Sequence, residues 1–133
     1  MAKTWREKLN NGRQPETGPT QRTMAGITAG QIMLVPTPCQ VKDYIEAIPK
    51  GQVRSIDELK LDLAKQNGAE VTCPLCTGIF LRIVAEAALD EQKEGTPVDK
   101  ITPFWRVLDA KSKTAKKLSC GPDFLTQMRE SEA

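Results

Sequence analysis

Two cysteines three residues apart, Cys73 and Cys76, have the type and spacing best suited to chemistry in this chain. A C-x-x-C pair can cycle between dithiol and disulfide, or supply half of a metal site. A helix beginning beside Cys76 would favour its nucleophilic thiolate form. A Cys₄ zinc site would need Cys39 and Cys120 to converge on the pair, without a second C-x-x-C motif. We therefore predict reduced structural thiols, no metal and no cofactor. A redox or thiol-dependent transferase role for Cys76 is the alternative.

The chain of 133 residues contains no histidine. This excludes Ser–His and Cys–His catalysis, and also zinc sites with imidazole ligands. An apolar content of 39% and a charged content of 27% are typical of a soluble globular domain. No apolar run approaches the ~20 residues that span a bilayer, and the polar N-terminus lacks the core of a signal peptide. We expect a single cytoplasmic domain with no membrane contact.

The basic residues are concentrated in one short segment. The formal net charge is only +2, yet residues 111–117 carry four lysines and no acid. Residues 1–30 also carry more bases than acids, whereas the middle of the chain has a slight excess of acids. Such a segment suits contacts to nucleic-acid phosphates, which give affinity without sequence information. The predicted phosphate contacts are Lys111, Lys113, Lys116 and Lys117, and the alternative is a solvated surface loop.

The segment Pro103–Val107 places two aromatic rings, Phe104 and Trp105, beside a cation, Arg106. Flat aromatic faces can stack on an extruded base or line an apolar pocket. The alternative is that both rings belong to the core of a buried strand. We expect Arg106 to tie this segment to a neighbouring carboxylate or carbonyl.

Periodicity and capping signals predict the elements that must position these residues. Ser55 to Glu58 fits a capping box, and Thr37–Pro38 is a second helix start. The expected elements are a short helix over 4–9, an edge strand over 31–35, helices over 37–48 and 55–66, a third helix over 78–92, a strand over 102–108, a basic wing over 111–117, and a final helix from about 123.

Three motifs in this order resemble the DNA-binding core of the O6-alkylguanine-DNA alkyltransferases. They are Ile48-Pro49-Lys50-Gly51, Arg82-Ile83-Val84-Ala85-Glu86-Ala87 and Pro103-Phe104-Trp105-Arg106-Val107. The family has Pro-Cys-His-Arg-Val in the last motif, so Phe104 stands at the alkyl-accepting cysteine and Trp105 at the activating histidine. The resemblance therefore implies a non-catalytic, alkyltransferase-like protein. It covers roughly residues 35–121.

The resemblance also assigns roles to individual residues. Arg82 matches the arginine that enters the base stack when a nucleotide is flipped out. Ile56, which follows Ser55, stands where the family has a tyrosine that helps to rotate the target phosphate, a contact that isoleucine cannot make. Glu86 replaces a small residue of the family and would repel phosphate on a groove-facing surface. We place Ser55 and Arg82 among the DNA contacts, and Phe104, Trp105 and Arg106 around a base or alkyl pocket.

The sequence thus predicts a mainly α fold with short β strands, of the winged helix-turn-helix type found in alkyltransferases. Residues 1–30 are expected to be a flexible basic tail and residues 31–133 the domain. The predicted function is recognition of duplex DNA in repair, with alkylated guanine or distorted duplex as the ligand and a repair protein as a further partner. We expect a monomer. A protein-binding module that has lost DNA binding is a second alternative.

Overall fold

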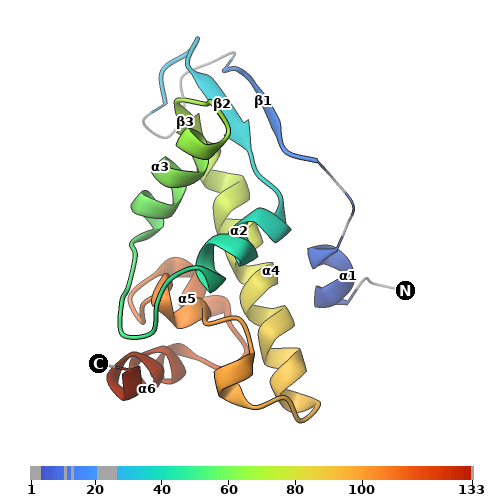
Figure 1. Cartoon of the computed structure of the whole chain (residues 1–133), viewed down its shortest axis with the longest axis vertical. Helices are drawn as coiled ribbons and strands as arrows, with labels where there is room; N and C mark the ends of the chain where they lie inside the picture. The colour runs from blue at the N-terminus through green and yellow to red at the C-terminus, as the bar shows by residue number, and fades with distance from the viewer. Residues whose placement is uncertain (1–3, 11, 13, 21–26, 133) are drawn as a thin grey trace.

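The computed structural model describes residues 4–10, 12, 14–20 and 27–132. It is mainly helical, with a small three-stranded sheet at one end (Figure 1). The predicted fold class of helices with short strands is confirmed at this level. Within the described residues, no helix is both long enough and apolar enough to cross a membrane.

The chain contains the following helices and strands, of which α4 is the longest helix. They are α1 (Trp5–Leu9), β1 (Glu16–Pro19), β2 (Ile32–Val35), α2 (Pro38–Glu46), α3 (Ile56–Gln66), β3 (Val71–Thr72), α4 (Pro74–Lys93), α5 (Lys113–Lys117) and α6 (Pro122–Glu132). Two 3₁₀ turns, η1 (Val98–Lys100) and η2 (Phe104–Arg106), lie between α4 and α5.

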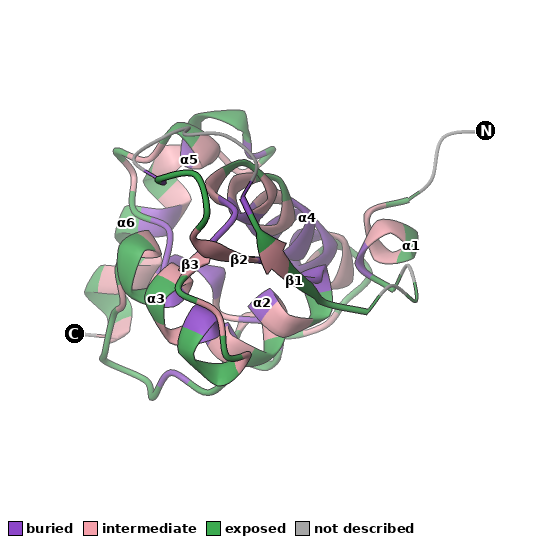
Figure 2. Cartoon of the chain, turned by 90° about the horizontal axis from the view of Figure 1, so that it is seen from above, coloured by how far each residue is buried: buried purple, intermediate pink, exposed green. Residues whose placement is uncertain are grey.

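Helix α4 is the centre of the core. It packs against α1, α2, α5 and η2, and Figure 2 shows α1, α2 and α5 on different sides of it. Its residues from Ile83 to Leu89 are all buried, so this stretch of the helix is surrounded by protein. A helix in this position fixes the other elements relative to one another, because each buries its apolar face against the same rod.

Helix α4 begins at Pro74, four residues before the predicted start at Gly78. Pro74 occupies the first turn, where its missing N–H costs nothing, and the sulfur of Cys73 accepts a hydrogen bond from the amide of Cys76 at 3.4 Å. The prediction was wrong because it treated Gly78 as a boundary. The other expected starts are confirmed: Thr37 and Ser55 each form a capping box.

The N-terminal segment, expected to be a flexible tail over 1–30, contains the short helix predicted over 4–9 and a strand that was not predicted. Helix α1 packs on α4 and buries Leu9, and β1 pairs antiparallel with β2 from Glu16 opposite Val35 to Pro19 opposite Ile32. Strand β2 is therefore the central strand, not an edge, because β3 pairs with its other side in parallel. Three of the four β1 residues are exposed, so no apolar alternation marked the strand in the sequence. The rest of the expected tail, 1–3, 11, 13 and 21–26, lies outside the described residues.

The strand predicted over 102–108 and the wing predicted over 111–117 are both wrong. Phe104–Arg106 is a 3₁₀ turn, in which the amide of Arg106 donates to the carbonyl of Pro103 at 3.0 Å. A tight turn lets the adjacent Phe104 and Trp105 both enter the core, whereas neighbours on a strand point to opposite faces. Residues 113–117 form helix α5, capped by Ser112 and held to the core by the buried Ala115.

Candidate nucleic-acid interface

Helix α5 and the turn before it present the four predicted phosphate contacts to solvent. Lys111, Lys113, Lys116 and Lys117 are all exposed, and none has an ion-pair partner among the residues that the structure describes. The buried Ala115 points the opposite way, so the helix turns its basic side outward. Four such ammonium groups on one short segment could contact phosphates without breaking an ion pair of the described residues.

Ser55 lies across a hollow from the start of α5. The hollow has a volume of about 340 Å³, and its lining includes Arg54, Ser55, Ser112 and Arg129. The hydroxyl oxygen of Ser55 accepts a hydrogen bond from the amide of Glu58 at 3.0 Å, which caps α3. The structure thus places Ser55 close to the lysine segment 111–117, although its hydroxyl already caps α3.

Arg82 lies near the other end of α5. It shares a face of α4 with Glu86, four residues further on. The Glu86 carboxylate accepts hydrogen bonds from the amide (3.2 Å) and the hydroxyl (2.7 Å) of Ser119, just after α5. Arg82 is therefore one helical turn from the point where α5 is anchored to α4.

Glu86 does not present a free charge to a ligand. Only 5% of this residue is exposed, and its carboxylate is used by Ser119. The repulsion of phosphate that the sequence suggested for Glu86 is therefore not expected from this geometry. The acids closest to the interface are instead Asp57, Glu58 and Asp109, which line the hollow beside Ser55.

The first half of α4 carries two exposed apolar side chains on the same face as Arg82. Leu75 is 73% exposed and Ile79 is 51% exposed, and with Arg82 they follow the four- and three-residue spacing of a single helix face. The sequence reasoning missed both, because it began the helix at Gly78 and assigned Ile79 to the buried face. Arg54 and Arg129, the basic residues of the hollow, were also missed. Their sequence separation from the lysine segment left no local signal.

Phe104 and Trp105 lie in the core and do not form the walls of an open base pocket. They are 0% and 2% exposed. Phe104 stacks on Phe124 with ring centroids 5.8 Å apart, and its edge contact with Trp105 spans 5.3 Å. Trp105 lines a hollow of about 500 Å³ together with other residues, including Lys50 and Glu132. Arg106 lines the same hollow but Phe104 does not, so the structure does not show a pocket shared by both rings.

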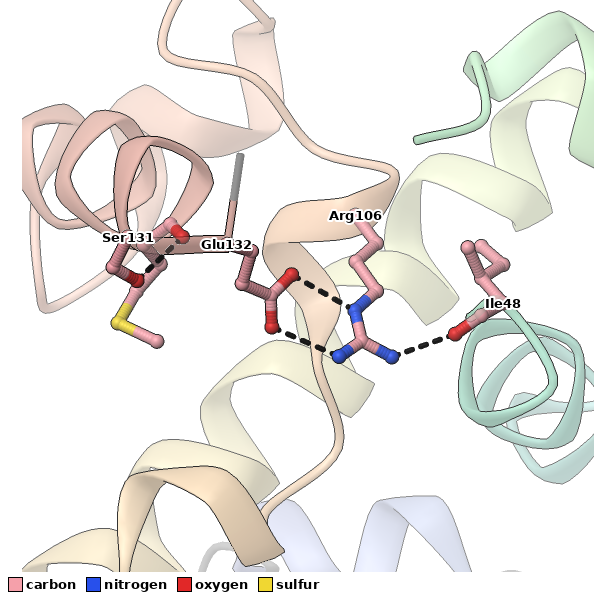
Figure 3. A network of polar contacts seen from close by, with 5 residues as sticks. Ile48, Arg106, Ser131 and Glu132 are labelled. Atoms are coloured by element: carbon pink, nitrogen blue, oxygen red, sulfur yellow. Dashed lines mark hydrogen bonds and ion pairs between the residues drawn. The ribbon is translucent and has the colours of Figure 1, made fainter. Parts of the chain in front are cut away.

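Arg106 ties η2 to two other elements (Figure 3). Its guanidinium donates to both carboxylate oxygens of Glu132 in α6, at 3.0 and 2.8 Å, and to the carbonyl of Ile48 after α2, at 2.6 Å. The hydrogen bonds from Arg106 hold the pKa of Glu132 below its ordinary value. The structural tie expected for Arg106 is confirmed, and all three guanidinium nitrogens take part in it.

The position of Cys76 near the start of a helix suggested a lowered thiol pKa, whereas in the structure this pKa is raised. Burial, together with a hydrogen bond to Cys73, raises the pKa of the Cys76 thiol to about 11. Burial also raises the pKa of Cys120. All four cysteines are free thiols, and the described residues contain no group of three or more potential metal ligands of the His, Cys, Asp and Glu types. These observations disfavour the alternative of a reactive Cys76 thiolate.

Ile56, at the position where the resembled family has a tyrosine, is partly buried and packs against the hydrophobic core. It begins α3 and lines the hollow beside Ser55. Its aliphatic side chain can neither donate nor accept a hydrogen bond from a phosphate.

Comparisons of this chain with protein-family models, with curated proteins and with solved structures gave no match. The function must therefore be argued from the geometry of the interface.

Proposed function

We propose that this protein binds duplex DNA through the surface formed by α5, the hollow beside Ser55 and the exposed face of α4. The observation that carries this proposal is the set of four exposed lysines without ion-pair partners on α5 and its preceding turn. A hollow containing Arg54 and Arg129 adjoins one end of this segment, and the Arg82 face of α4 adjoins the other. The winged helix-turn-helix arrangement stays a prediction: strand β3 lies between α3 and α4, and helix α5 stands where the wing was expected.

The chemistry of the surface favours contacts to the DNA backbone. Ammonium groups bind phosphate without reading the base sequence, and each contact releases counterions from the duplex. Leu75 and Ile79 offer apolar contacts of the kind that minor-groove proteins press against base steps. The preference for O6-alkylguanine stays a prediction, since the buried Phe104 offers no free face to an extruded base.

Fluorescence anisotropy with a labelled duplex tests this proposal. The test variant changes Lys111, Lys113, Lys116 and Lys117 to Gln. The matched control changes four other exposed lysines, Lys50, Lys65, Lys93 and Lys100, to Gln, and so lowers the net charge equally. We expect the test variant to lose at least about tenfold in affinity, and the control to lose much less. Equal losses in the two variants would contradict a localised interface.

The same titration separates the remaining alternatives. Duplexes with and without O6-methylguanine test the predicted lesion preference, which would be seen as a lower Kd for the lesion. Incubation with the lesion duplex followed by mass spectrometry tests for alkyl transfer, since a methyl replacing a hydrogen adds about 14 Da. We expect no such adduct on Cys76 because its thiolate is scarce at neutral pH. Affinity that is weak and independent of salt would instead favour a module that binds protein.

A further inference from the structure

Helix α1 covers the side chain of Arg82. The Trp5 ring lies over the guanidinium, with 5.2 Å between the Arg82 Cζ atom and the ring centroid. Arg82 belongs to a face of α4 whose preceding members, Leu75 and Ile79, are more than half exposed. The cover therefore falls on the cation that lies next to Ile79 on that face.

The contact leaves a donor of Arg82 without a partner. Its Nε atom is buried, and no described residue accepts a hydrogen bond from it. A buried donor on a charged group loses its bonds to water and gains no replacement here except the ring. Release of the cover would return this donor to solvent or offer it to a phosphate oxygen.

A second cation lies close to the indole ring of Trp5. The Nζ atom of Lys8 lies 4.5 Å from the Trp5 ring centroid. Two positive groups near one ring repel each other, which opposes the attraction of each to the ring. A polyanion such as DNA would relieve this repulsion once either cation moved towards it.

Helix α1 packs against both α4 and α2, but it is a very short element. It contains five residues, too few to be stable as an isolated helix. Apart from Trp5, it is held by the buried Leu9, by an exposed ion pair between Arg6 and Glu94, and by the Leu9 carbonyl, which accepts from the Cys39 thiol at 3.3 Å. An exposed ion pair contributes little to stability. The element that covers Arg82 is thus a single short helix, and one of its attachments to α4 is a solvent-screened ion pair.

We propose that α1 is an autoinhibitory cover, which hides Arg82 in the free protein and is displaced when duplex DNA occupies the adjoining surface. This inference rests on the proposed DNA-binding function and adds regulation to that site. Closure lowers the fraction of molecules able to use Arg82. A cover that is closed in about nine-tenths of the molecules weakens binding by about tenfold.

The test compares full-length variants by duplex affinity. Trp5→Ala removes the covering ring, and Trp5→Phe retains an aromatic face as the matched control. We expect Trp5→Ala to tighten binding by roughly three- to tenfold, and Trp5→Phe to resemble the wild type. The gain should vanish when Arg82→Ala is added. Unchanged or weaker binding by Trp5→Ala would overturn the proposal, as would a gain that survives Arg82→Ala.

A second variant and a measurement without DNA keep the two proposals distinguishable. Arg6→Ala breaks the ion pair to Glu94, so we expect tighter binding even though a positive charge is lost. Weaker binding would contradict the cover. Modification of Arg82 by phenylglyoxal, followed by mass spectrometry, should be faster in Trp5→Ala than in the wild type. Faster modification without salt-dependent DNA binding in any variant would refute the DNA function while leaving the covering contact established. Equal modification rates would refute the cover itself.

Discussion

The ion pair between Arg106 and Glu132 gives a prediction about stability, and its magnitude follows from the burial and hydrogen bonds of the two side chains. The two side chains are only 13% and 10% exposed, and two hydrogen bonds join them. Removing one partner of a buried ion pair costs about 3–5 kcal/mol, because the remaining charge is left unpaired. The slight exposure of this pair places Glu132→Leu near the lower end, at about 3 kcal/mol.

Arg106→Met should cost more than Glu132→Leu, because it also removes the donor to the Ile48 carbonyl. We expect a further ~1 kcal/mol for that bond, giving about 4 kcal/mol for Arg106→Met. The double variant leaves no unpaired charge. It should therefore cost only about 1 kcal/mol, for the lost bond to the Ile48 carbonyl, well below the ~7 kcal/mol that independent effects would give.

Urea denaturation of the wild type, both single variants and the double variant, followed by far-ultraviolet circular dichroism at neutral pH, measures these free energies of unfolding. The cycle should yield a coupling energy of about 6 kcal/mol, most of it the cost of the charge that each single variant leaves unpaired. If the losses of stability in the two single variants add up to the loss in the double variant within about 0.5 kcal/mol, the two groups are independent and the stabilising ion pair is refuted.

Three further predictions concern pH, capping and thiol reactivity. The pKa of Glu132 is lowered in the folded state, so its stabilising contribution is complete above the ordinary pKa of a glutamate and is lost as the pH falls through the lowered value. Thermal denaturation between pH 7 and pH 3 should therefore show a smaller acid-dependent loss in Glu132→Gln than in the wild type; equal losses would contradict the shift. Ser55→Ala should cost about 1 kcal/mol in urea denaturation, whereas Ser55→Asp should keep the cap and weaken DNA binding. Equal stability of the alanine variant and the wild type would show that the cap contributes nothing. The alkylation rate of Cys76 by iodoacetamide should keep rising with pH beyond 9 and level off only near 11, as peptide mass spectrometry can follow; a plateau near pH 8 would show an activated thiol.

The helix starts were predictable because their signals are local. The capping box predicted at Ser55 joins residues three apart and forms as expected, and the helix start predicted at Thr37 is confirmed, with a capping box to Gln40 that was not predicted. The segment around Phe104 was not predictable in this way. Two adjacent buried aromatics fit a strand buried on both faces, and only the packing of Phe124 against them shows why a tight turn is used instead.

The interface was predictable in its residue types but not in its arrangement. The lysines of 111–117 stand out by composition alone, whereas their nearness to Ser55 and to the Arg82 face depends on tertiary contacts. Glu86 illustrates the limit most clearly. Its charge suggested repulsion of phosphate, but a bond to Ser119, 33 residues away, removes it from the surface. Likewise, nothing local links Trp5 to Arg82, and the sequence could not indicate the cover.

The salt dependence of duplex affinity tests the central claim most directly. For B-DNA, the logarithm of the binding constant falls against the logarithm of salt concentration by about 0.9 for each phosphate contact. If Lys111, Lys113, Lys116 and Lys117 each contact a phosphate, changing all four to Gln should reduce the magnitude of this slope by about 3.6. The control variant at Lys50, Lys65, Lys93 and Lys100 should keep the wild-type slope. A slope that is unchanged in the first variant, or equally reduced in both, would contradict DNA binding through α5.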